Sequence, residues 1–209
     1  MNIRPLQITL AILKPDVVAH PHIVKDIRSM ILKHGFLFVK SKKLHLSPVK
    51  AADFYEEHKG KFFVNRLVSF MSRLIKSYHQ KSSCMSDMNT MYIGMLICLS
   101  SGPVWTHILA REAAIPEWRQ LMGATKVLKT IYEDPESIRG KYGLTDTRNC
   151  AHGSDSEETA KREIQFFFPE FDVSKWYQET EPLFRSGQVR FDEEKVEHVP
   201  VLQNGTAGS

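Results

Sequence analysis

Apolar residues recur at every second position near the start of the chain, at Leu6, Ile8, Leu10 and Ile12. This period predicts a half-buried strand that ends by presenting Lys14 ahead of Pro15. Helical spacing of apolar residues follows from residue 23, and His34-Gly35 is a typical helix end. Residues 36–46 then predict a second strand, and Ser47-Pro48 starts a second helix, which runs to residue 60. A short apolar helix over residues 62–71 completes this first half.

The strand and helix patterns return after residue 100. Residues 103–110 predict a third strand, residues 112–122 a helix, and residues 124–148 a long ordered loop. A fourth strand is expected at or just before His152, followed by an amphipathic helix over residues 156–168. From residue 186 the chain becomes polar and glycine-rich. The pattern therefore predicts one α+β domain over residues 1–185 and a mobile tail over residues 186–209.

Residues 73–100 interrupt this order. The segment is rich in methionine and serine, shows no sustained helical or strand period, and contains one glycine and no proline. An added core or interface segment is one interpretation. The other, which we favour, is a translated intron that was never selected to fold, with the domain closing around it. Its apolar part, residues 91–99, is too short for a membrane-spanning helix.

Composition narrows the class of protein. A chain of 209 residues with 42% hydrophobic content can bury a sizeable core. The 28 basic and 24 acidic residues give a net charge of +4, which favours polyphosphates without indicating a nucleic-acid binder. Three scattered cysteines do not form a disulfide framework. Because the first residues also lack a secretory signal pattern, we expect an intracellular protein, cytoplasmic or mitochondrial.

The most informative stretch is Asn149-Cys150-Ala151-His152-Gly153-Ser154-Asp155-Ser156, which leads into the predicted helix over residues 156–168. His152 is therefore expected near the positive end of a helix dipole, where backbone N–H groups favour anions. A neutral imidazole in such a place is a candidate nucleophile toward a phosphoryl group. The alternative is a turn histidine whose ring only hydrogen-bonds the helix start, and this stretch alone does not decide between the two.

Two more motifs accompany it in order, Ala11-Ile12-Leu13-Lys14-Pro15-Asp16 and Asp146-Thr147-Arg148-Asn149. Together they resemble nucleoside diphosphate kinases, and a divergent branch of that family in particular, from about Gln7 to about Tyr177. The resemblance implies a ferredoxin-like βαββαβ sandwich with a four-stranded antiparallel sheet and an added helical hairpin. It also implies transfer of the γ-phosphoryl group of ATP to nucleoside diphosphates through a phosphohistidine, which yields GTP, CTP and UTP.

The resemblance assigns roles to individual residues. His152 is implied as the nucleophile, with Ser154 and Glu163 orienting its imidazole and Tyr55 as the tyrosine of the site. The residues implied to bind nucleotide are Lys14 and Asn149 at the ribose, Arg119, Thr125 and Arg139 at the phosphates, and Phe63 stacking on the base. Without the resemblance, Phe63 reads as a core residue, Arg119 as an exposed helix arginine and Glu163 as one more helix carboxylate.

Nucleoside di- and triphosphates are thus the expected ligands, with Mg²⁺ held through nucleotide phosphates and water rather than by a protein cage. No specific nucleic acid and no membrane span are expected. A homo-oligomer or a partner protein is possible.

Three departures from the family pattern count against an active enzyme. Gly123-Ala124-Thr125-Lys126-Val127 replaces the family's Gly-Glu-Thr-Asn-Pro, the loop from there to Arg139 is longer, and residues 73–100 are inserted. The loop contributes to subunit packing in the family. A catalytically weak relative that acts as an interaction or regulatory protein is therefore the competing hypothesis.

Overall fold

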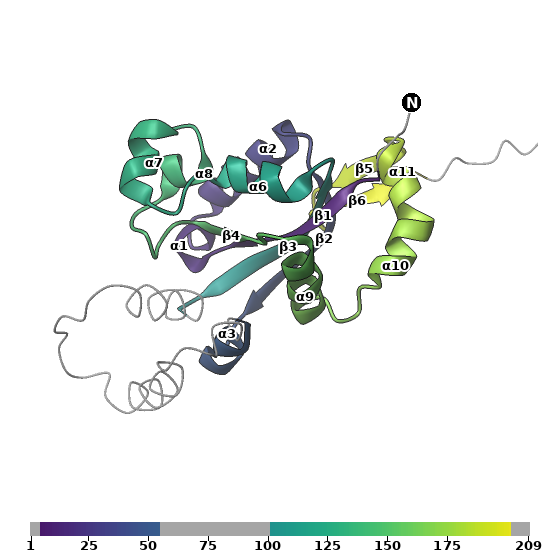
Figure 1. Ribbon diagram of the computed structural model, residues 1–209, viewed down its shortest axis with the longest axis horizontal. Coiled ribbons are helices and arrows are strands. Elements are labelled where there is room, and N and C mark those ends of the chain that lie inside the picture. Colours follow the sequence, from purple (N-terminus) through teal and green to yellow (C-terminus); the bar gives the residue numbers. More distant parts are fainter. Residues whose placement is uncertain (1–4, 55–100, 202–209) are drawn as a thin grey trace, which may run out of the picture.

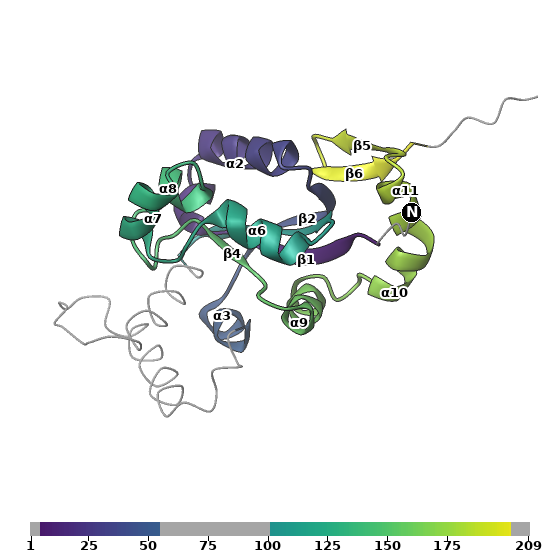
Figure 2. The same ribbon diagram turned by 45° about the horizontal axis from the view of Figure 1, so that its top comes forward.

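The computed structural model describes residues 5–54 and 101–201. It is built around an antiparallel sheet of order β2-β3-β1-β4, whose strands are β1 Gln7–Leu13, β2 Leu37–His45, β3 Pro103–Arg111 and β4 Ala151–Gly153. Helices lie on both sides of this sheet, with α2 and α6 on one side and α3 and α9 on the other (Figures 1 and 2). The α+β sandwich with a four-stranded antiparallel sheet is therefore confirmed.

The helices follow the order expected from the sequence. In the first half they are α1 Pro15–Val18, α2 Pro21–Lys33 and α3 Pro48–Phe54; in the second half α6 Ala114–Met122, α7 Val127–Glu133, α8 Ile138–Tyr142, α9 Glu157–Phe167, α10 Val173–Lys175, a π-helical turn η2 Trp176–Thr180 and α11 Glu181–Arg185. Gly35 follows α2 with φ of 73°, a left-handed conformation that glycine adopts without strain. Ser156 caps α9 by accepting a hydrogen bond from Thr159 N.

Strand β1 is buried on both faces, not on one as its alternation predicts. Leu10 and Ile12 pack into the core beneath α9, whereas Ala11 and Leu13 pack into the core beneath α2 and α6. All four side chains are completely buried. The alternate positions with polar or smaller side chains therefore do not mark a solvent-facing side, because β1 lies between β3 and β4 and helices cover both of its faces.

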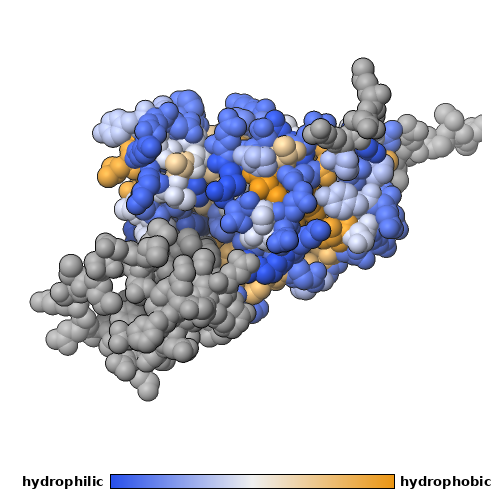
Figure 3. Space-filling view, viewed as in Figure 1, coloured by the Kyte–Doolittle hydropathy of each residue, from blue (hydrophilic) through white to orange (hydrophobic). Residues whose placement is uncertain are grey.

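The region predicted as a loop over residues 124–148 contains two short helices, α7 and α8. Val127 and Thr130 of α7 are buried, and the Thr130 hydroxyl oxygen lies 2.9 Å from the carbonyl oxygens of Ala124 and Lys126, either of which accepts its one proton. The outer side of α7 is also apolar, with Leu128 76% and Tyr132 84% exposed, and Figure 3 shows apolar surface there. A helix of two turns with apolar residues on both sides gives no clear 3.6-residue period, so the loop prediction was wrong here.

The mobile tail predicted from residue 186 is wrong as far as residue 201. Strands β5 Val189–Asp192 and β6 Glu197–Pro200 form an antiparallel hairpin. This hairpin docks on the edge of β2, where Phe38 N donates to His198 Nδ1 at 2.9 Å and Ser41 N to Glu197 Oε1 at 3.0 Å. The polar composition of this segment is typical of a mobile tail, but here the polar side chains bond to the backbone of an edge strand instead of to water.

The interpretation of residues 73–100 and the predicted helix over residues 62–71 lie outside the described residues. Of the added helical hairpin, the structure describes α3. Within the described ranges, none of the helices is long and apolar enough to cross a membrane.

Candidate active site

His152 lies at the centre of β4, paired with Ile12 of the buried strand β1. The prediction of a strand at this position is thus confirmed. Trp118 of α6 donates its indole N–H to the carbonyl of His152 at 3.2 Å. The same indole ring packs so closely on Gly153 that an added Cβ would collide with it. A tryptophan and a glycine therefore fix the backbone on which the imidazole is mounted.

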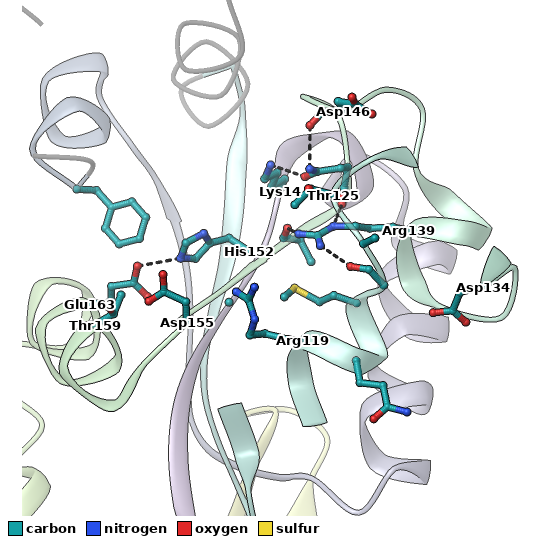
Figure 4. A pocket seen from close by; sticks show the side chains of 18 of the residues that line it. Lys14, Arg119, Thr125, Asp134, Arg139, Asp146, His152, Asp155, Thr159 and Glu163 are labelled. Atoms are coloured by element: carbon teal, nitrogen blue, oxygen red, sulfur yellow. Dashed lines mark hydrogen bonds and ion pairs between the residues drawn. The ribbon is translucent and has the colours of Figure 1, made fainter. Parts of the chain in front are cut away.

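The imidazole of His152 is held by a carboxylate. Its Nε2 lies 2.9 Å from Glu163 Oε1, and Ser154 Oγ donates to Glu163 Oε2 at 2.6 Å (Figure 4). Glu163 and Ser154 are buried, whereas the His152 side chain keeps 19% of its surface exposed. Because a carboxylate only accepts hydrogen bonds, the proton of the neutral ring lies on Nε2 and the lone pair on Nδ1. This is the arrangement that an oriented nucleophile requires.

Phe54 is a second contact of the imidazole, and no sequence motif predicts it. Its ring meets that of His152 edge to face, with centroids 5.3 Å apart, and also packs against Phe166 and Phe167 of α9. Phe54 comes from α3, about a hundred residues before His152. Such a contact depends on tertiary packing, and no local pattern signals it.

Lys14 and Asn149 form a buried pair. Lys14 Nζ donates to Asn149 Oδ1 at 2.6 Å and to the carbonyl of Thr147 at 3.4 Å, and the lysine side chain is among the largest that are fully buried. The amide nitrogen of Asn149 donates in turn to the carbonyl of Asp146 at 2.9 Å. Burial of a lysine without such partners would be costly, so this end of the site is built around the pair.

Arg139 is bound to the backbone from three sides. Its guanidinium donates to the carbonyls of Gly123 at 2.6 Å, Ala151 at 2.9 Å and Asn149 at 3.2 Å. Burial lowers the pKa of Arg139 to about 10, and the positive charge of Arg119 acts in the same direction. The group remains charged at neutral pH. Arg139 therefore ties the strand that carries His152 to the loop after α6.

Arg119 and Thr125 form an exposed wall of the site. Arg119 lies on α6, and Thr125 lies in the loop before α7. Among the residues that the structure describes, Arg119 has no hydrogen-bond or ion-pair partner. An exposed arginine beside a buried one makes this wall positively charged and suits it to an anion.

These side chains line one cavity of about 650 Å³. The predicted site residues that border it are Lys14, Arg119, Thr125, Arg139, Asn149, His152 and Glu163. They come from α6, α8, β4, α9 and the connecting loops, and they surround the cavity in Figure 4. Ser154 does not border the cavity itself; it donates a hydrogen bond to Glu163, which does. Tyr55 and Phe63 lie outside the described residues.

A strained residue connects the two halves of the site. Cys150 has φ of 70°, an uncommon left-handed value for a residue other than glycine. Its N–H donates to Asp16 Oδ2 at 3.0 Å, and its carbonyl accepts from Lys14 N at 2.8 Å. The Lys-Pro-Asp motif thus supports the His152 strand directly, and Asp16 has a structural role that the sequence analysis did not assign.

The described residues contain no group of three or more His, Cys, Asp or Glu side chains that could hold a metal ion. The acidic side chain closest in sequence to His152 that borders the cavity is Asp155.

Comparisons with known proteins agree with this geometry. The family model described as nucleoside diphosphate kinase matches residues 7–92 and 76–173, two stretches that overlap over residues 76–92. The chain is 46% identical to nucleoside diphosphate kinase 6 of Xenopus tropicalis over 94% of both chains. It is 42% identical to nucleoside diphosphate kinase 6 of Homo sapiens over 92% of this chain and 89% of the relative.

Solved structures give the same result. The nucleoside diphosphate kinase of Aquifex aeolicus superimposes with a TM-score of 0.59 at 29% identity, over 78% of this chain and 95% of that one. A halophilic nucleoside diphosphate kinase from Halobacterium salinarum, solved in complex with CDP, gives a TM-score of 0.58 at 27% identity, over 82% and 98%.

Proposed function

The chain belongs to the nucleoside diphosphate kinase family, and from this premise we propose that it transfers the γ-phosphoryl group of ATP to nucleoside diphosphates through a phosphohistidine at His152. The observation that carries the proposal is the bond between His152 Nε2 and Glu163 in a cavity that Lys14, Arg119 and Asn149 also line. A nucleophile, a positive wall and a polar pair thus share one cavity of about 650 Å³, which is large enough for a nucleotide.

In the first half-reaction the lone pair of His152 Nδ1 attacks the γ-phosphorus of ATP. A P–N bond forms, the bond from that phosphorus to the β,γ-bridging oxygen breaks, and its electron pair leaves with ADP. In the second half-reaction a terminal β-phosphate oxygen of another nucleoside diphosphate attacks the phosphorus. The P–N bond then breaks, and its electron pair returns to Nδ1 as the lone pair of neutral His152.

Glu163 stabilises the charged form of this intermediate. As Nδ1 bonds to phosphorus, positive charge develops on the imidazole, and the carboxylate 2.9 Å from Nε2 opposes it. Ser154 holds the carboxylate at 2.6 Å, so the imidazole does not need to reorient during the reaction. This is the role of the third group in an activated nucleophile.

The remaining residues position the nucleotide. Arg119 and Thr125 offer a guanidinium and a hydroxyl to the phosphates from the exposed wall, and the Lys14–Asn149 pair offers polar atoms to the ribose. Arg139 supports this site through its bonds to three backbone carbonyls, and it also lines the cavity. Tyr55 and Phe63 are proposed to complete the site, Phe63 by stacking on the base in a way that tolerates any base.

Mg²⁺ is proposed to reach the site on the nucleotide. Bound with the nucleotide, it would neutralise phosphate charge during transfer and would keep phosphate and water ligands.

Isotope exchange tests the proposal. Purified protein is incubated with ATP and labelled ADP in the absence of any other nucleotide, and label is expected to appear in ATP. Such exchange shows transfer of the γ-phosphoryl group to a nucleoside diphosphate, and phosphate that stays on the protein after the nucleotide is removed shows that the enzyme itself carries it. His152→Ala is expected to abolish both. If the wild-type protein binds nucleotide but shows neither exchange nor transfer to GDP, CDP or UDP, the proposal is wrong. The competing function, an interaction protein that retains the nucleotide fold, would then be favoured.

A further inference from the structure

Asp146 borders the cavity in the turn between α8 and β4, and the reaction described above gives it no role. We infer that Asp146 is a positioning residue: it joins the Thr125 loop on one wall of the cavity to Asn149 on the other and thereby sets nucleotide affinity. The inference rests on the proposed function, because it assumes that nucleotide occupies this cavity.

The main chain of Asp146 orients the ribose end of the site. Its carbonyl accepts the amide N–H of Asn149 at 2.9 Å, as the dashed line beside Asp146 in Figure 4 shows. With the amide nitrogen fixed there, Asn149 Oδ1 faces Lys14 Nζ at 2.6 Å. The amide of Asn149 therefore has one orientation before any ligand binds.

The side chain of Asp146 fixes the opposite wall. Asp146 Oδ1 accepts the backbone N–H of Val127 at 2.9 Å, across 19 positions of sequence. Val127 is the first residue of α7, and Lys126 before it provides no side-chain cap, so Asp146 satisfies a helix donor that would otherwise have no protein partner. Thr125, the hydroxyl offered to the phosphates, is two residues from this bond.

The second carboxylate oxygen contributes less. Asp146 Oδ2 lies 3.3 Å from Lys126 Nζ, but the lysine side chain is 75% exposed and the aspartate side chain 40%. Exposed ion pairs of this kind stabilise weakly because water and salt screen them. The hydrogen bond to Val127 N–H is therefore the contact that transmits the positioning effect.

The sequence provides an independent reason to link these positions. Where the family pattern ends Gly-Glu-Thr-Asn-Pro, this chain has Gly123-Ala124-Thr125-Lys126-Val127. Proline has no N–H to donate, so the bond from Val127 to Asp146 is available only because of this departure. One of the features that counted against an active enzyme thus creates a bond that holds the site together.

The test is the equilibrium dissociation constant for ADP and for UDP, measured by calorimetry on the full chain. Asp146→Ala is expected to raise both constants about tenfold, which corresponds to about 1.4 kcal/mol. Asp146→Asn keeps an oxygen acceptor for Val127 N–H and is expected to stay within about threefold of wild type. Lys126→Ala, which removes only the exposed ion pair, is expected to stay within about twofold.

Val127→Pro is the matched second variant, because it removes the N–H and keeps the carboxylate, at a helix position where proline is tolerated. It is expected to weaken binding as much as Asp146→Ala, and the double variant is expected to bind no more weakly than either single one. Wild-type affinity in Asp146→Ala, equal losses in the Ala and Asn variants, a loss for ADP but not for UDP, or additive losses in the double variant would each overturn the inference. A wild-type protein that binds neither nucleotide would overturn the proposed function as well.

Discussion

Two histidines of the central sheet lie in contrasting chemical environments. His152 on β4 and His107 on β3 are each the end of a three-member hydrogen-bonded chain. The chain at the site runs from His152 Nε2 to Glu163 and on to Ser154. In the other, His107 Nδ1 lies 2.7 Å from Ser41 Oγ, which donates to the carbonyl of Val196 at 2.6 Å.

The group in the middle of each chain, Glu163 or Ser41, determines which nitrogen of the imidazole carries the proton. A serine hydroxyl has one proton, and Ser41 gives it to Val196, so His107 must donate from Nδ1 and keep its lone pair on Nε2. His107 is fully buried, and among the described residues its Nε2 has no hydrogen-bond partner. Burial, with the nearby charge of Arg28, lowers the pKa of His107 to about 3. His152 instead borders a cavity and is hydrogen-bonded to the carboxylate of Glu163. A nucleophilic histidine thus needs access and an anionic partner, and His107 has neither.

The largest effects on kcat and on stability are expected when each of the two histidines is replaced by asparagine. His152→Asn is expected to lower kcat for transfer by at least about a thousandfold, or about 4 kcal/mol of transition-state stabilisation, with thermal stability almost unchanged. His107→Asn is expected to do the reverse, lowering the unfolding midpoint while the folded fraction keeps its kcat. Steady-state kinetics and thermal unfolding of both variants measure these effects. A His107→Asn variant that is stable but inactive would contradict the structural role of His107.

Replacing the charged middle member should have the next largest effect. Glu163→Gln keeps a hydrogen-bonding group of the same size but removes the negative charge, and kcat is expected to fall about a hundredfold. Ser154→Ala, which leaves the charge but removes its support, is expected to cost about tenfold. If Glu163→Gln retained wild-type turnover, the carboxylate would be no more than a structural partner of the ring.

The buried histidine should be visible in the pH dependence of stability. The pKa of His107 in the folded protein, about 3, lies below its ordinary value of 6.5. Its contribution to stability is therefore complete above pH 6.5 and is lost as the pH falls toward 3. Between pH 7 and pH 5 this amounts to about 2 kcal/mol. Denaturant unfolding at the two pH values is expected to show that loss in the wild-type protein and to lack it in His107→Asn. Equal pH dependence in both proteins would mean that His107 is protonated without penalty.

The polar pair at the ribose end should have the smallest of these effects. Lys14→Ala is expected to lower kcat/KM about tenfold, or about 1.4 kcal/mol, and Asn149→Ala by a similar factor. Because the two side chains are hydrogen-bonded at 2.6 Å, the double variant should lose less than the product of the single losses. Fully multiplicative losses would show that the residues act independently.

Local sequence signals were sufficient for part of this site. The motifs around Lys14 and His152 carry their chemistry within a few residues, and strand pairing brings Leu13 beside Ala151, so the two motifs meet. Phe54, Trp118 and Asp146 were missed because their roles arise from contacts between distant elements. The hairpin β5–β6 was missed for a related reason, since its polar residues satisfy backbone donors of β2.

The role proposed for His152 is tested most directly by identifying the phosphorylated atom. The protein is incubated with ATP, and ³¹P and ¹⁵N NMR of the phosphorylated chain determine which imidazole nitrogen carries phosphorus. Because Glu163 lies 2.9 Å from Nε2, we predict a single phosphohistidine, bonded through Nδ1 of His152 and absent from His152→Asn. Phosphorus on Nε2, or an equal amount of phosphohistidine in His152→Asn, would contradict it.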